Sequence, residues 1–164
     1  MSIRILLMNA AIGALYAGLT SFLAPLSYGP VQVRLSECMV LLAFYNKRWI
    51  PGLVVGCFLA NIGSPFGLTD MVVGTFATLI AVCGMRFCRA LWQASLVPVF
   101  ANGIIIGLEL AYLAEIPRDA ASILSVMAYI GLGEFLAVSI VGTALMKLLL
   151  RNPVLREYVM EIRN

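Results

Sequence analysis

The sequence predicts an all-α integral membrane protein, a bundle of six helices with both termini in the cytoplasm. Three observations predict this fold class. Hydrophobic residues make up 62% of the chain and the mean hydropathy is +1.01, whereas a soluble domain is roughly 45–50% apolar. The apolar residues fall into six stretches, and the basic residues between them alternate in number from one side to the other. The lipid bilayer is therefore the expected environment.

The six apolar stretches have unequal lengths. They run approximately over residues 5–26, 36–46, 49–62, 70–85, 91–114 and 122–150. A helix rises 1.5 Å per residue and needs about 20 residues to cross ~30 Å of hydrocarbon. The first, fifth and sixth stretches meet this length, whereas the second and third are too short alone. We expect those two to lie partly inside protein or to line a cavity.

The two ends of the chain are interpreted differently. The first apolar run is longer than the 7–15-residue core of a signal peptide, so it is expected to remain as a helix. At the other end, Asn152 and Pro153 should break the sixth helix. Residues 1–151 are therefore predicted to form one six-helix membrane domain, and residues 152–164 a short cytoplasmic tail whose charged and apolar residues alternate.

Basic residues support six crossings, because cytoplasmic loops collect Lys and Arg near the ends of spanning helices. With both termini inside, nine of the eleven basic residues are cytoplasmic and only Arg34 and Arg118 lie outside. Merging the second and third stretches removes Lys47 and Arg48 from the cytoplasm and spoils this partition. The predicted location is a multi-pass protein of the cell membrane. The nine cytoplasmic residues are Arg4, Lys47, Arg48, Arg86, Arg89, Lys147, Arg151, Arg156 and Arg163.

The composition argues against an enzyme. The chain has no His, which excludes H-E-x-x-H zinc sites, His-assisted nucleophiles and His proton relays. Its four Cys residues form no C-x-x-C pair and are interpreted as apolar filler. We therefore predict no catalytic residue, no metal and no cofactor.

Small residues recur on two of the predicted helices. Ala10, Ala14 and Gly18 are spaced by four on the first helix, and Gly52, Gly56 and Ala60 are spaced by four on the third. Close approach at such residues holds membrane helices together. The spacing alone allows either contact within the monomer or, for the first helix, a face for docking another membrane subunit.

Polar residues provide the candidate site, because an acid inside a membrane is costly and normally faces a partner or a water-filled cavity. In the six-helix arrangement Glu37, Asn61, Asp70 and Glu109 lie at the outer side, and Asn102 and Glu134 lie near mid-span. With Gln32 and Arg34 of the polar box at 28–37, they are predicted to line a cup open to the outside. Two alternatives remain open: Glu134 as a structural acid, and Asp70 as a helix N-cap after Thr69.

Such a cup suits a small, flat ligand rich in hydrogen-bond donors. A carboxylate can accept two parallel bonds from a guanine-like edge, Arg34 can donate to a ring oxygen, and a second carboxylate can neutralise an aminomethyl cation. Stacking surfaces are expected from Tyr28, Phe66, Tyr112 and Tyr129, although Tyr112 also suits interfacial anchoring.

Four segments resemble one known family. They are Y-G-P-V-Q-V-R-L-S-E at 28–37, I-P-G-L-V-V-G-C-F-L-A-N at 50–61, S-P-F-G-L-T-D at 64–70 and G-T-F-A-T-L at 74–79. Together they resemble the QueT family of queuosine-precursor transporters, which are substrate-binding S components of energy-coupling factor transporters. The resemblance is specific over 28–79 and covers the rest of the chain in length and helix count.

The resemblance implies several properties of this chain. A 7-deazaguanine such as 7-aminomethyl-7-deazaguanine or queuine would be captured from outside the cell. Partners would be a transmembrane coupling subunit, docked on the small-residue stripe of the first helix, and two cytoplasmic ATPases; no nucleic acid is expected. The chain has no G-x-x-x-x-G-K-[ST] phosphate loop of its own. Alternatives are an S component for another vitamin-like solute, a proton-coupled carrier or channel using Glu109 and Glu134, and a membrane enzyme.

Overall fold

The structure is a computed structural model that describes residues 2–29, 32–113, 117 and 119–160. All regular elements of the described residues are helical. They are α1 (Ile3–Phe22), α2 (Ala24–Ser27), the 3-10 helix η1 (Leu35–Leu41), α3 (Leu42–Tyr45), η2 (Lys47–Trp49), α4 (Ile50–Ala60), η3 (Asn61–Gly63), α5 (Leu68–Gly84), η4 (Met85–Phe87), α6 (Leu91–Leu113), α7 (Ala120–Glu134), the π-helix η5 (Phe135–Gly142), α8 (Thr143–Leu149) and α9 (Pro153–Met160). The predicted all-α class is confirmed.

Four helices are long and apolar enough to cross a membrane. They span Ile3–Phe22, Leu68–Phe87, Leu91–Leu113 and Ala120–Leu149. The two stretches predicted to be too short form an apolar helix at Leu35–Tyr45 and the 11-residue α4. The six predicted stretches therefore all become helices, four of spanning length and two shorter.

The first short segment lies inside the protein, as expected for its length. Element η1 packs between α1 and η5, and most of its side chains are buried. Protein rather than lipid can therefore satisfy its polar groups and its irregular 3-10 backbone. The central core forms around it, with Tyr16, Leu41, Trp49 and Leu53 almost completely excluded from solvent.

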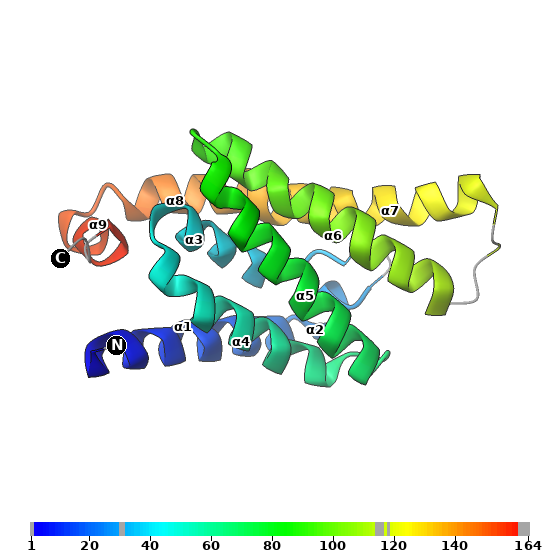
Figure 1. Cartoon of the computed structure of the whole chain (residues 1–164), viewed down its shortest axis with the longest axis horizontal. Coiled ribbons are helices and arrows are strands. Elements are labelled where there is room, and N and C mark those ends of the chain that lie inside the picture. Colours follow the sequence, from blue (N-terminus) through cyan, green and yellow to red (C-terminus); the bar gives the residue numbers. More distant parts are fainter. Residues whose placement is uncertain (1, 30–31, 114–116, 118, 161–164) are drawn as a thin grey trace.

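The two termini lie at the same end of the elongated bundle, at the left of Figure 1. The connection from α3 to α4 and the connection from α5 to α6 lie at this end too. Two contacts join α9 to its neighbours at this end. The Trp49 indole of η2 donates to the Val159 carbonyl over 3.3 Å, and the Arg4 guanidinium of α1 lies 5.1 Å from the Tyr158 ring centre. The predicted tail thus contains a helix, α9, which packs back onto the bundle. Arg118 and Arg163 of the predicted charge partition lie outside the described residues.

Glycines allow α1 and α4 to approach closely. A Cβ atom on Gly56 would lie 2.9 Å from Gly13 Cα, and one on Gly52 would lie 2.6 Å from the Asn9 carbonyl oxygen. The Asn9 side chain adds a 2.7 Å hydrogen bond from Gly52 N–H. The small-residue stripe of α4 therefore makes contacts within the monomer.

The small-residue stripe on α1 points away from α4 and the rest of the bundle. Ala10, Ala14 and Gly18 are exposed, and no atom lies within 4 Å of a Cβ built on Gly18. The residues of α1 that meet the bundle are instead Asn9, Gly13, Tyr16 and Thr20. The stripe of Ala10, Ala14 and Gly18 is therefore not the face on which α1 packs against the bundle.

The sixth apolar stretch is continuous but changes its helical pitch. Glu134 ends α7, and the π-helix η5 follows before α8 resumes the α-helical pattern. The break predicted at Asn152 and Pro153 is confirmed, because α8 ends at Leu149 and the Asn152 side chain accepts from Val154 N–H at the start of α9.

Candidate ligand-binding site

All eight residues predicted to bind substrate have buried side chains. None is more than 8% exposed, although they come from the loop before η1 and from five further elements. Their burial is unusual for ionisable and amide groups, which are mostly exposed in proteins. They are Gln32, Arg34, Glu37, Asn61, Asp70, Asn102, Glu109 and Glu134.

Arg34 connects the loop before η1 to the start of α5. Its Nη2 atom lies 3.6 Å from Asp70 Oδ2, an ion pair that is longer than a hydrogen bond. The Asp70 carboxylate also accepts from the Ser64 hydroxyl, and Arg34 Nε donates to the Ser27 carbonyl over 3.4 Å. The guanidinium lies 5.6 Å from the ring centre of Tyr28, within the range of a cation–π contact. These contacts hold both charges away from lipid.

The role of Asp70 as a helix N-cap is excluded by these contacts. The residue that caps α5 is Gly67, which has a positive φ of 61° and makes no side-chain cap hydrogen bond. Asp70 lies one turn further on, with its carboxylate directed to Ser64 and Arg34.

Glu37 lies deeper, against the buried face of α1. Tyr16 donates its hydroxyl proton to Glu37 Oε1, and a second hydroxyl pair, Thr20 with Ser36, lies beside it at 2.6 Å. Both pairs join η1 to α1. They position one edge of the carboxylate and leave Glu37 Oε2 without a hydrogen-bond partner among the described residues.

The mid-span pair predicted from α6 and the last helix is present as a direct contact. Asn102 Nδ2 donates to Glu134 Oε1 over 2.8 Å, and Gly103 lets α6 approach Gly131 closely. The electrostatic influence of both Glu37 and Arg34 reaches Glu134. Glu109 lies two helical turns after Asn102 on α6, and it interacts electrostatically with Asp70 and Arg34. We refer to these buried acids, with Arg34 and the amides of Asn61 and Asn102, as the cluster.

The cluster has a surplus of hydrogen-bond acceptors. Within the described residues, one buried donor without a partner is Arg34 Nη2, and the buried oxygens without a partner are Ser27 Oγ, Glu37 Oε2, Asn61 Oδ1, Asp70 Oδ1, Asn102 Oδ1, both Glu109 carboxyl oxygens and Glu134 Oε2. A buried acceptor left unpaired costs about 1–3 kcal/mol. Four carboxyl groups also share one guanidinium among these residues. The arrangement therefore favours a bound group that donates hydrogen bonds and carries positive charge.

Gln32 occupies a strained backbone position beside this cluster. Its φ is +46°, a conformation that residues other than glycine rarely adopt, and its N–H donates to the Gly29 carbonyl over 3.0 Å.

Asn61 lies at the C-terminal end of α4 and packs its amide closely on Gly74. A Cβ atom on Gly74 would lie only 2.6 Å from Asn61 Nδ2.

Sequence reasoning missed Tyr16, Thr20 and Ser64. The first two lie with Asn9 and Gly13 at spacings of four, three and four, so they share the helix face that turns to the bundle. That polar pattern was a usable signal. Ser64 carried none, because only the folded loop after α4 brings its hydroxyl to Asp70.

The predicted stacking residues divide into two groups. Tyr28 lies under Arg34 and donates its hydroxyl to the Ala60 carbonyl, and Phe66 packs on a small cluster around Ala77. Tyr112 and Tyr129 are 64% and 55% exposed, so their rings lie at the outer surface of the bundle.

The fold and the buried cluster together define a class: a multi-helix membrane protein with ionisable groups gathered in its interior. Comparison with known proteins identifies the family. The QueT transporter family matches residues 6–151, and the chain belongs to this family. The queuosine precursor transporter QueT of Lactococcus lactis subsp. cremoris strain MG1363 is 33% identical over 142 residues, covering 77% of this chain and 80% of the relative. No solved structure matches.

Proposed function

We propose that this protein is the substrate-binding S component of an energy-coupling factor importer and that it captures a 7-deazaguanine precursor of queuosine from outside the cell. The relative named above is a queuosine precursor transporter, and this chain belongs to the same family, so transport is the general function from which the proposal begins. The observation that supports the ligand class is the surplus of buried acceptors and carboxyl groups described above.

The chemistry of the ligand complements the cluster. Glu37 or Glu134 can accept two parallel hydrogen bonds from the ring N–H and exocyclic amine of a guanine-like edge, and Arg34 can donate to the ring oxygen. The aminomethyl cation of 7-aminomethyl-7-deazaguanine would lie near Asp70 and Glu109. Asn61 and Asn102 complete the polar edge with their unpaired amide oxygens.

Binding requires the site to open, because all eight side chains are buried in this state. The segment that carries Gln32 and Arg34 connects to the body through the contacts of Arg34 with Ser27 and Asp70. We infer that this segment moves aside to admit the ligand and then closes over it. Release would follow reorientation of the whole body beside a coupling subunit.

Energy would come from partner proteins. The exposed stripe of Ala10, Ala14 and Gly18 supports docking of a transmembrane coupling subunit, because small side chains let a partner helix approach closely. Two cytoplasmic ATPases would complete the importer. In this arrangement both termini and the basic loops face the cytoplasm, with six segments across the bundle.

The test is ligand binding by the purified protein. Thermal unfolding is measured with 7-aminomethyl-7-deazaguanine, queuine, guanine and a set of vitamins. We expect the 7-deazaguanines to raise the unfolding temperature more than guanine does. Stabilisation by a vitamin alone would contradict the proposed ligand and would favour an S component for another solute.

Two substitutions test the site itself. Glu134→Gln and Glu37→Gln each remove a charged acceptor, so each should weaken binding of 7-aminomethyl-7-deazaguanine by ~1.5–3 kcal/mol, roughly ten- to 150-fold, in isothermal titration calorimetry. Glu157→Gln on the exposed surface of α9 is the matched control and should leave the affinity unchanged. Unchanged affinity in folded Glu134 and Glu37 variants would remove both residues from the site.

A proton-coupled carrier is the second candidate function. Glu109 and Glu134 are buried acids with carboxyl oxygens free of protein hydrogen bonds among the described residues, so water could exchange protons with them, as in a proton relay. Proton flux through the isolated chain in liposomes, dependent on the ligand, would favour that mechanism over the importer subunit.

A further inference from the structure

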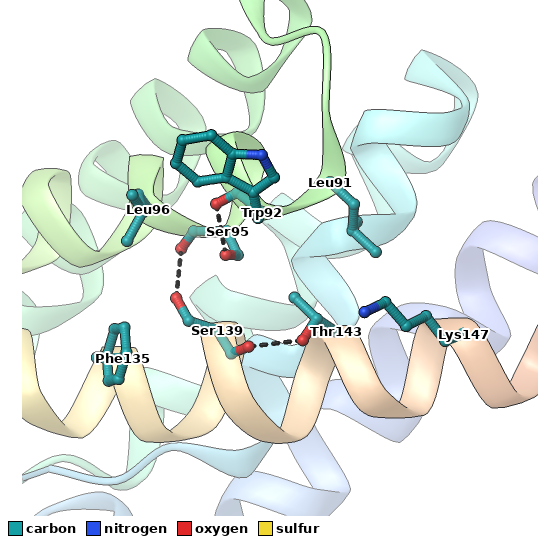
Figure 2. Close-up of a pocket in the computed structure, with 8 residues that line it drawn as sticks. All are labelled: Leu91, Trp92, Ser95, Leu96, Phe135, Ser139, Thr143 and Lys147. Carbon is teal, nitrogen blue, oxygen red and sulfur yellow. Dashed lines mark hydrogen bonds between the residues drawn. The ribbon is translucent and has the colours of Figure 1, made fainter.

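A groove of about 420 Å³ lies on the bundle surface between the start of α6 and the segment η5–α8 (Figure 2). It contains none of the eight residues of the candidate ligand site. Its lining is Leu91, Trp92, Ser95, Leu96, Phe135, Ser139, Thr143 and Lys147.

The hydroxyl groups in this groove are already used. Ser95 donates to the Trp92 carbonyl over 2.8 Å, Ser139 donates across to the Ser95 carbonyl over 3.3 Å, and Thr143 donates to the Ser139 carbonyl over 2.6 Å (Figure 2). With these protons directed to backbone, the floor offers mainly methyl, methylene and ring surface. Such a floor suits a hydrocarbon chain better than a polar solute.

The available polar groups are at the rim. Lys147 is exposed and forms no ion pair within the part of the chain that the structure describes, and its side chain points towards Thr143 at one end of the groove (Figure 2). The Trp92 side chain is 63% exposed, and its indole N–H has no hydrogen-bond partner among the described residues. Lys and Trp are both residues that anchor at the boundary between hydrocarbon and headgroups.

The charge of the groove lining is positive, because Lys147 is its one charged residue. The chain has no Asp or Glu at residues 91–96 or 135–147, the two segments that line the groove. A negatively charged headgroup would meet no opposing acid from either segment, and each basic residue near an anionic leaflet attracts it.

We propose that this groove is a binding site for an anionic phospholipid of the leaflet that faces the basic loops. One acyl chain lies along Leu91, Leu96 and Phe135, and the phosphate meets the Lys147 ammonium, with the Trp92 indole beside the glycerol. The site goes beyond the proposed transport function and shares no residue with it.

Native mass spectrometry of the detergent-purified protein tests the proposal, with phosphatidylglycerol, phosphatidylcholine and inorganic phosphate as probes. Phosphatidylglycerol should bind more tightly than phosphatidylcholine, and Lys147→Gln should weaken it about fivefold, the factor for one lysine at an anionic surface. Lys47→Gln, at an exposed lysine that does not line the groove, is the matched control and should have no effect. Leu96→Trp, which fills the groove, should reduce binding of both lipids.

Three results would overturn the proposal. Equal binding of the two lipids in wild type would remove the role of charge, and inorganic phosphate competing with phosphatidylglycerol would indicate a soluble-anion site. Unchanged lipid binding in Leu96→Trp, with loss of a co-purifying protein subunit instead, would make the groove a protein-docking surface. Thermal unfolding without added lipid verifies that each variant is folded, and 7-deazaguanine binding should be retained whether or not the lipid site exists.

Discussion

At the scale of single residues, the molecule is defined by charges that are buried and only partly compensated. Arg34 and Asp70 form an ion pair at 3.6 Å, and each also has a neutral partner, Ser27 for the guanidinium and Ser64 for the carboxylate. Transfer of either charge from water is costly, so the pair persists only because both members are present. The same rule makes the unpaired oxygens of Glu109 and Glu134 informative about the ligand.

The ion pair gives a prediction for stability. Asp70→Asn preserves size but leaves Arg34 buried without its carboxylate, so the ligand-free protein should lose ~3–5 kcal/mol of stability, as when one partner of a buried pair is removed. Thermal or denaturant unfolding in detergent measures the change. Asp119→Asn is the control, because Asp119 is an exposed N-cap of α7 and Asn caps helices equally well. A stable Asp70→Asn protein would mean that another acid compensates Arg34.

At the scale of helices, close approach at glycine decides the packing. Helices α1 and α4 meet at Gly13, Gly52 and Gly56, and α6 meets α7 where a Cβ on Gly107 would lie 2.7 Å from Met127 Cα. Lipid tails are as apolar as these side chains, so the gain comes from van der Waals contact and the Asn9 hydrogen bond rather than from hydrophobic burial. These contacts fix α1 and η1 where Tyr16 can reach Glu37.

Two glycines on this pair of helices should respond differently to the same change. Gly56→Ala places a methyl group 2.9 Å from backbone of α1, so the helices must separate and stability should fall by about 1–3 kcal/mol. Gly18→Ala meets no atom within 4 Å and should be neutral or slightly stabilising, because Ala favours a helix. Unfolding temperatures in detergent compare the two. Equal changes in stability for the two variants would show that the close contact at Gly56 does not govern the packing of α1 on α4.

At the scale of the whole molecule, different parts of the bundle carry different kinds of residue. Buried carboxyl groups occupy the interior, the basic loops and both termini gather at one end, and α1 leaves a face of small residues uncovered. The proposed importer subunit would use each of these surfaces. The proposed docking on α1 is therefore separable by mutation from ligand capture.

The docking stripe gives a prediction for assembly. Ala14→Leu adds bulk to an exposed position, so folding and ligand affinity should be unchanged while import falls at least about tenfold, equivalent to ~1.4 kcal/mol of lost association. Co-purification of the coupling subunit and import of labelled ligand by cells measure the effect. Ala144→Leu is the control, since Ala144 is exposed and lies on α8 rather than on α1. Equal losses from both would place docking elsewhere.

Much of the fold follows from local sequence. Runs of apolar residues near 20 in length can satisfy their backbone in lipid only as helices, so α1, α5, α6 and the segment α7–α8 were predictable from composition and length. The burial of Glu37, Asp70, Asn102 and Glu134 was also predictable, because acids and amides in a bilayer need partners.

The sequence by itself determined the class of protein, the number of apolar segments and which polar residues would be buried, because each depends on transfer between water and hydrocarbon. Only the tertiary structure decided the pairings: Arg34 with Asp70, Tyr16 with Glu37 and Asn102 with Glu134. It also decided that α4 uses its glycines inside the monomer whereas the stripe on α1 stays exposed. The physical reason is that pairing depends on helix rotation and distance in space, which residue spacing along one helix does not specify.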